Sequence, residues 1–392
     1  QPLFIFDEVV APLQQEVPKL KKVFDGLVTS AELLPVFAGY PEERSYLFIL
    51  QNNREMRPSG GFIGTYGILN IENAEIKDFF TDNSYNLDKP SEAYLDIEAP
   101  EPLQKYMSQE KWYFRDSNWW PDFPTSAEKM QWFYLAEGGE EELDGVIALT
   151  PTVVEELMKI WGEFEVGGLL FKTDNFWEQL QYQVEFGYYQ QGISDIDRKD
   201  IIGDLGALMI ARLFEMPMNE WPNLFELISE QIEQKQILLY FNEPEYQQIA
   251  LERGWAGEVK DFSGDYFMLV DTNLAALKTD SVMDRTINYD LKQTNEGLKA
   301  IASITYQNLG NFSWKTTRYR TYSRIYVPRG SQIERVIIND REVDMADIDI
   351  TQEFDKQIFG TFLEVEPQSS KTIIWQYTLP DSLKKMFIDK EY

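Results

Sequence analysis

Two arginines occupy a polar turn between apolar segments, in the sequence RSYLFILQNNREMRPSGGFIGTYGILNI that covers residues 44–71. Short apolar runs bounded by turn residues indicate strands, so the pattern predicts buried strands at 45–51 and 62–71. Ligands of open α/β sheets collect beyond the carboxyl ends of the strands, which makes Arg54 and Arg57 candidates for binding an anion. The alternative is that both arginines pair with neighbouring carboxylates, because ion-pair networks also gather charges.

A further cation, Arg198, lies near the start of a helix that we predict at 195–214. Ser194 and Asp195 carry side-chain oxygens that suit the cap of this helix. Free amides and the helix dipole favour anions at a helix N-terminus, and a neighbouring arginine strengthens a phosphate site. The alternative is that Arg198 pairs with Asp195 or Asp204 and that the acidic residues only cap the helix.

A loop rich in aromatic residues carries Arg115, Asp116 and Asp122 around Trp119 and Trp120. Flat apolar rings beside a few polar groups are typical of ligand clefts, so the two tryptophans are candidates for stacking on sugar rings or on an isoprenoid tail. The alternative is a loop that folds inward as a satellite core. Carboxylate oxygens are ligands that Mg²⁺ prefers, which makes Asp116 and Asp122 candidate magnesium ligands.

The composition excludes several classes of function. The chain has 392 residues, of which 43% are hydrophobic, so it can bury a large core divided over two or three domains. Its net charge of −30 argues against nucleic acid and anionic lipid surfaces as broad partners. The chain has no histidine and no cysteine, so Ser-His-Asp triads, most catalytic zinc sites and thiol nucleophiles are excluded. Any catalysis must use carboxylates, arginine, lysine or tyrosine.

Three patterns follow one another along the chain. Residues 1–40 carry apolar positions at helical spacing, and residues 41–280 alternate strands with helices, which predicts an α/β domain with a mixed sheet and flanking helices. Residues 281–392 hold short alternating runs separated by turns, which predict a β-sandwich. No apolar run is long enough to span a membrane. The sequence leaves open whether an anchor segment lies upstream of Gln1.

The elements expected in the α/β domain have approximate bounds. Further strands are predicted at 75–80, 145–149 and 237–241. Helices are predicted at 124–135, 151–161, 173–186, 195–214, 219–235 and 244–252.

Four segments resemble a bacterial and archaeal envelope family that is known only as domain of unknown function four-zero-one-two. They are LQNNREMRPSGGFIG at 50–64, RDSNWWPDFPTSA at 115–127, DGVIALTPTVVEEL at 144–157 and RIYVPRGS at 324–331. The resemblance implies an extracytoplasmic, envelope-associated protein that a membrane anchor would hold at the membrane. It implies no particular activity.

The order of the motifs also looks like that of the LytR-CpsA-Psr phosphotransferases. Arg54 takes the place of an arginine after the first strand, Arg115 and Asp116 match an Arg-Asp pair, and Asp195 and Arg198 match an Asp-x-x-Arg motif. This resemblance implies enzymes that attach glycopolymers to cell walls from polyprenyl-pyrophosphate carriers. In such enzymes arginines bind the pyrophosphate, acidic residues lie near magnesium, and the lipid tail lies in a hydrophobic tunnel.

The chain departs from that pattern in several places. Ile201 stands where a second arginine is expected, Gly187 to Tyr189 stand where paired arginines are expected, and Asn52 and Asn53 replace an acidic residue. These changes remove charge that would hold a pyrophosphate and a metal.

Two functions therefore stay open. In the first, the α/β domain binds an anionic lipid-linked or polymeric glycan and transfers it. Arg54, Arg57, Arg115 and Arg198 would hold phosphate by electrostatic clamping, and Asp116 would hold a metal or act as the base. In the second, the protein is a non-catalytic envelope module for binding or scaffolding. The two functions differ in whether the four arginines converge on one cavity with an apolar tunnel behind it.

Overall fold

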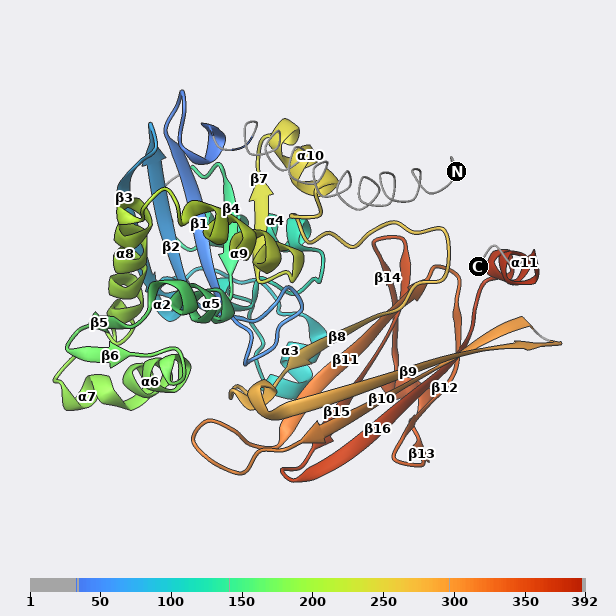
Figure 1. Ribbon diagram of the computed structural model, residues 1–392. Coiled ribbons are helices and arrows are strands. Elements are labelled where there is room, and N and C mark those ends of the chain that lie inside the picture. The colour runs from blue at the N-terminus through green and yellow to red at the C-terminus, as the bar shows by residue number, and fades with distance from the viewer. Residues whose placement is uncertain (1–32, 34, 141, 296, 390–392) are drawn as a thin grey trace, which may run out of the picture.

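The computed structural model describes residues 33, 35–140, 142–295 and 297–389 (Figure 1). The helical segment predicted at 1–40 lies outside these ranges except for Leu33 and residues 35–40. No helix within the described ranges combines the length and the apolar character needed to span a membrane.

A five-stranded mixed sheet forms the first half of the described chain (Figure 1). Its strand order is β3-β2-β1-β4-β7, in which β1 runs parallel to β4 and the other neighbours are antiparallel. The predicted mixed sheet is therefore confirmed, and its strands lie close to the predicted positions. They are β1 Arg44–Asn52, β2 Phe62–Glu72, β3 Glu75–Asn83, β4 Gly145–Leu149 and β7 Ile237–Phe241.

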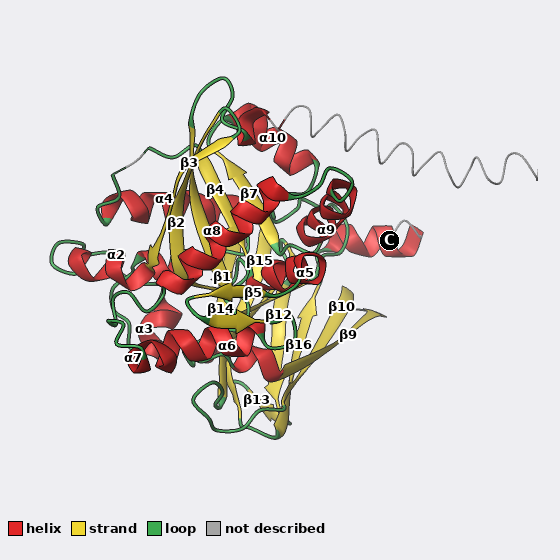
Figure 2. Cartoon of the chain, turned by 60° about the vertical axis from the view of Figure 1, so that its left-hand side comes forward, coloured by secondary structure: helices red, strands yellow, loops and turns green. Residues whose placement is uncertain are grey.

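Helices cover both faces of this sheet. On one face α4 and the aromatic loop pack against Leu47 and Ile49 of β1, whereas Phe48 and Leu50 face α5 and α8 on the other. Figure 2 looks onto the second face, where α8 crosses in front of the strands. Because β1 is covered on both sides, its sequence is a continuous apolar run. The helices are α2 Ser84–Ser91, α3 Glu101–Met107, α4 Phe123–Ala136, α5 Pro151–Trp161, α6 Phe176–Tyr182, α7 Tyr188–Gln190, α8 Asp200–Glu215, α9 Trp221–Glu233 and α10 Pro244–Glu252.

Two of the predicted helices differ in detail from the structure. The helix predicted at 195–214 begins at Asp200, because Ser194 and Asp197 hydrogen-bond to each other in a turn that precedes it. The helix predicted at 173–186 is α6, which continues into a π-helical turn at Gln183–Gly187. A small hairpin of β5 Phe164–Val166 and β6 Leu169–Phe171 follows α5.

The C-terminal part consists of two antiparallel sheets around one apolar core, so the predicted β-rich region is confirmed. One sheet has the order β13-β12-β16-β10-β9 and the other β14-β15-β11-β8. β8 precedes residue 280, where we place the domain boundary, and pairs with β11. The elements are β8 Met268–Asn273, β9 Met283–Thr294, β10 Gly297–Asn308, β11 Tyr319–Pro328, β12 Gln332–Ile338, β13 Arg341–Glu342, β14 Asp349–Glu353, β15 Lys356–Val365, β16 Ser369–Thr378 and the terminal helix α11 Asp381–Asp389.

Gly145 at the start of β4 offers a test of the sheet. A methyl group at this position would lie 2.1 Å from the carbonyl oxygen of Tyr240 on β7. We expect Gly145→Ala to lower the free energy of unfolding by about 1–3 kcal/mol, because relief of the clash separates two paired strands. Denaturant unfolding measures this change, and an unchanged unfolding midpoint would contradict the described pairing of β4 with β7.

Candidate functional site

A polar pocket of about 260 Å³ lies between the end of β1, the turn before α8 and the segment after β8. Three cations and two carboxylates contribute to its wall, which gives it a mixed charge with a small excess of cations. They are Arg198, Lys199, Lys278, Glu55 and Glu185. The rings of Phe62, Tyr85 and Trp177 complete the wall.

An apolar cavity of about 310 Å³ adjoins this pocket, between the sheet and helices α5 and α8. Phe48 and Leu69 line it from the sheet, Leu157 from α5, and Leu205 and Met209 from α8. The two cavities meet at side chains that line both of them, namely Leu50, Pro151, Leu180 and Ile202. The arrangement suits a ligand with a polar head and a hydrocarbon tail.

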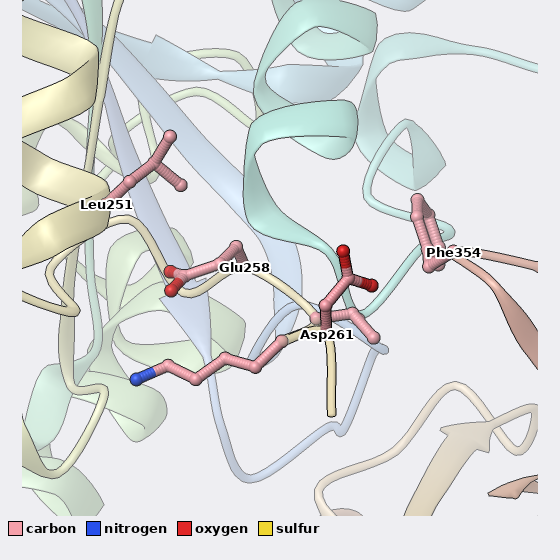
Figure 3. A pocket seen from close by; sticks show the side chains of 6 residues that line it. Leu251, Glu258, Asp261 and Phe354 are labelled. Carbon is pink, nitrogen blue, oxygen red and sulfur yellow. The ribbon is translucent and has the colours of Figure 1, made fainter. Parts of the chain in front are cut away.

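Another pocket, shown in Figure 3, is a shallow depression near the end of α10. Leu251, Glu258, Asp261 and Phe354 line it, and the carboxylates of Glu258 and Asp261 point in different directions. The side chain of Asp261 is 93% exposed. Exposed carboxylates that point in different directions cannot act together on one ligand. The candidate site is therefore the polar pocket with its apolar cavity.

Arg57 is buried behind the wall of the polar pocket. Its guanidinium donates to Asp116 Oδ1 from Nε and Nη2, each at 3.3 Å, and to the carbonyl oxygen of Asn273 at 2.6 Å. The guanidinium carbon lies 5.1 Å from the ring centre of Phe62, which lines the pocket. An aromatic ring therefore stands between Arg57 and the ligand space.

Arg115 lies in the same buried region. Its Nη1 donates to Asp88 Oδ2 at 2.6 Å, and its guanidinium carbon is 5.0 Å from the ring centre of Tyr85. Asp88 is fully buried and interacts with the buried carboxyl group of Glu137. Burial raises the pKa of both acids, and the nearby Asp88 charge helps to bring the pKa of Glu137 to about 9. A pKa this high keeps the Glu137 carboxyl group protonated at neutral pH.

The other two predicted arginines lie closer to the pocket. Arg54 donates to Glu155 at 2.8 Å and stacks 4.4 Å above the ring of Trp177, which lines the pocket. Arg198 lines the pocket itself, with Glu185 at 3.4 Å and Asp195 at 3.6 Å. The four predicted arginines thus surround one pocket, but each has a carboxylate partner and only Arg198 contributes to the wall.

The two candidate magnesium ligands do not fit a metal site. Both oxygens of Asp122 accept hydrogen bonds at the start of α4, from Thr125 and from the amide of Val259 at 2.8 Å. Asp116 accepts from Arg57 and, through its other oxygen, from Gln109 at 3.0 Å. Among the residues that the structure describes, no three acidic side chains come together as a metal centre.

Trp119 and Trp120 pack inside the protein rather than in the polar pocket. Trp119 is buried and stacks on Tyr322 of β11, with ring centres 6.2 Å apart, and Arg324 donates to its carbonyl oxygen at 3.0 Å. Trp120 lies 5.7 Å from the ring of Trp112. These contacts correspond to the alternative of a loop that folds inward.

Two lysines of the pocket were not among the residues predicted from the sequence. Lys199 donates to Asn83 Oδ1 at 2.8 Å and to the carbonyl oxygen of Gly64. Burial, together with the charges of Arg198 and Lys278, lowers the pKa of Lys199 to about 7. Lys278 pairs with Glu55 at 2.8 Å. Lys199 directly follows Arg198 in the sequence, whereas Lys278 reaches the pocket only through the tertiary fold.

The buried acid pair predicts a pH-dependent stability. Glu137 keeps its proton in the folded protein up to pH about 9, whereas in the unfolded chain it releases the proton near 4.5. Folding therefore binds a proton in this window, and the free energy of unfolding falls as the pH rises, by up to about 1.4 kcal/mol per pH unit. We expect Glu137→Gln to remove this part of the slope, because the amide has no proton to lose.

Denaturant unfolding at several pH values between these limits measures the effect. Glu140→Gln is the matched control, because Glu140 is exposed in the same turn and should keep the slope of the wild type. Parallel pH profiles for the wild type and Glu137→Gln would show that Glu137 does not hold a proton in the fold.

Comparison with known proteins gives a match for residues 41–184, which include the pocket residues from Leu50 to Val184. No curated protein matches the chain. The matching family model ends before Lys199 and covers strands β1 to β4, the aromatic loop and α6. Residues 41–184 match the model of the family described as "Protein of unknown function (DUF4012)".

Proposed function

We propose that the α/β domain binds an anionic amphiphile, namely a lipid-linked envelope glycan, outside the cytoplasmic membrane. The phosphate lies in the polar pocket and the hydrocarbon tail extends into the apolar cavity. The observation that supports this proposal is that the two cavities adjoin at Leu50, Pro151, Leu180 and Ile202. A free phosphate ion would leave the apolar cavity unused, and a neutral lipid would leave the cations unused.

The cations of the pocket can hold a phosphate at the start of α8. Arg198 offers a guanidinium that binds phosphate oxygens through two hydrogen bonds, and Lys199 offers an ammonium at the helix N-terminus. Lys278 pairs with Glu55 and adds positive charge to the same pocket. An incoming anion favours the protonated form of Lys199, because its negative charge attracts the ammonium group.

The apolar cavity supplies affinity for the tail. Each methylene group that leaves water contributes about 0.8 kcal/mol. The cavity volume of about 310 Å³ lies at the small end of the range for ligand pockets, which is about 300–1,000 Å³. We therefore expect the cavity to hold the first isoprene units of a longer chain.

The same geometry favours binding over group transfer. Asp116, the base that the resemblance implies, accepts hydrogen bonds from Arg57 behind the ring of Phe62. Arg54, Arg57 and Arg115 already have carboxylate partners within 4.0 Å. A general base must reach the proton that it abstracts, and Asp116 does not reach the pocket in this arrangement. The role that we propose is therefore that of a non-catalytic binding module of the envelope.

Blocking the junction between the two cavities tests how the tail binds. We expect Ile202→Trp to weaken binding of farnesyl phosphate at least about tenfold, because the indole fills the passage and excludes several methylene groups. Binding of inorganic phosphate should not change. Isothermal titration calorimetry measures both affinities.

Leu170→Trp is the control for this experiment, because Leu170 is exposed on the β5-β6 hairpin and outside both cavities. Equal farnesyl phosphate affinities for Ile202→Trp and the wild type would place the tail elsewhere.

The low pKa of Lys199 predicts a pH-dependent affinity. A bound phosphate raises this pKa from about 7, so binding takes up a proton above neutral pH. Between about pH 7.5 and 9.5 we expect the affinity for farnesyl phosphate to fall by up to about tenfold per pH unit. The phosphate is already a dianion there, since its second pKa is about 6.

Lys199→Arg is the matched variant, because arginine keeps its charge throughout this range. Calorimetry in buffers of different ionisation enthalpy counts the protons taken up on binding. The same proton uptake in the wild type and in Lys199→Arg would exclude Lys199 as the phosphate ligand.

A further inference from the structure

Three exposed aromatic side chains lie on segments that adjoin the polar pocket and form what we call the aromatic rim. They are Tyr182, Phe186 and Trp314, with exposed fractions of 44%, 44% and 41%. Large aromatic side chains are usually buried, so exposed rings gathered beside a ligand pocket point to a contact surface.

The aromatic rim is continuous with the wall of the pocket. Tyr182 and Phe186 lie on the same helical segment as Gln181 and Val184, which line the pocket. The loop that carries Trp314 connects β10 and β11 and lies beside α6 (Figure 1). The rings therefore lie on segments next to the pocket, where a group attached to a bound phosphate can reach them.

Contacts with the segments that carry the pocket fix this loop in place. The amide of Lys278 donates to the carbonyl oxygen of Lys315 at 2.8 Å, and the Lys315 side chain pairs with Glu178 of α6 at 2.6 Å. The rings of Phe186 and Trp314 meet edge to face, with centres 5.0 Å apart and an angle of 87°. Rings at right angles form a corner that presents flat surface to solvent.

The chemistry of this corner suits a sugar ring. The face of an aromatic ring carries partial negative charge, and it attracts the polarised C–H groups on the apolar face of a pyranose. Exposed amide side chains that can bond hydroxyl groups lie next to the rings, since Gln190 donates to the Tyr182 hydroxyl at 3.1 Å and Gln191 accepts from the buried Gln183 at 2.9 Å. We propose that the aromatic rim stacks on the first sugar of the ligand, an inference that rests on the proposed function.

The charges around the rim favour a sugar over a membrane surface. Glu178, Glu185, Asp195 and Asp197 lie on the segments that carry the pocket and the rim. Anionic lipid headgroups repel such a surface. A neutral sugar meets no such repulsion, and its hydroxyl groups can use the same carboxylates as hydrogen-bond acceptors.

The test compares two ligands on the full chain, farnesyl diphosphate and the same diphosphate carrying one N-acetylglucosamine. We expect the wild type to bind the sugar-bearing lipid about two- to tenfold more tightly, as ring stacking alone allows. Trp314→Ala should bind both lipids with equal affinity, and its affinity for farnesyl diphosphate should equal that of the wild type. Trp314→Tyr should keep most of the preference, because it keeps a ring.

Phe262→Ala is the matched control, because Phe262 is 64% exposed and is not among the residues of the pocket or of the rim. A wild type that binds both lipids equally would overturn the sugar contact while leaving the proposed function intact. A wild type that binds neither lipid would overturn both proposals. Sedimentation with neutral phosphatidylcholine vesicles that is lost in Trp314→Ala would show instead that the rim contacts a membrane.

Discussion

The buried ion pair of Arg57 and Asp116 is the interaction on which the pocket depends. It joins the turn after β1, the aromatic loop and, through the carbonyl oxygen of Asn273, the end of β8. Removal of one partner would leave an uncompensated buried charge, so the three segments are held in one arrangement. Phe62 and Lys278 lie next to these segments, and the ion pair therefore fixes two walls of the pocket at once.

The pocket is also unusual within the charge pattern of the chain. The net charge is −30, yet Arg198, Lys199 and Lys278 approach one another at the start of α8. Arg198 and Lys278 each pair with a carboxylate, and burial lowers the pKa of Lys199 to about 7. Under our proposal such a site binds an anion without a strong general attraction for nucleic acid or anionic membranes, because the rest of the surface repels them.

The two halves of the described chain contribute to one site. The α/β domain supplies the apolar cavity and most of the pocket, while Lys278 and the loop around Trp314 come from the segments that accompany the β-sheets of the C-terminal part. Trp119 and Arg324 join the halves near the aromatic loop. The C-terminal part thus takes part in ligand binding under our proposal and is more than a spacer.

Local patterns predicted much of the fold and only part of the site. The strands β1, β2, β4 and β7 and the helices α4, α5 and α10 follow from apolar periodicity and from proline at helix starts. The helix α8 starts later than predicted, because a side-chain hydrogen bond of Ser194 stabilises a turn before it. No local pattern distinguishes an arginine that binds a ligand from one that pairs with a carboxylate far away in the sequence, as Arg57 does with Asp116.

The same limit applies to the roles that the sequence did not indicate. Lys278 lies in the pocket and pairs with Glu55, and Asp122, a candidate magnesium ligand in the sequence, caps α4 and accepts from the amide of Val259. These contacts join positions more than a hundred residues apart, so they follow from the fold rather than from spacing. Lys199 is the exception, because it directly follows Arg198 in the sequence and a second cation beside that arginine can be found without the structure.

A crystal structure of the full chain with farnesyl phosphate tests the central claim most directly. Our account predicts electron density for the phosphate between Arg198 and Lys199, and for the isoprenoid chain between the sheet, α5 and α8. An empty cavity at saturating ligand, or ligand density at another surface, would contradict it.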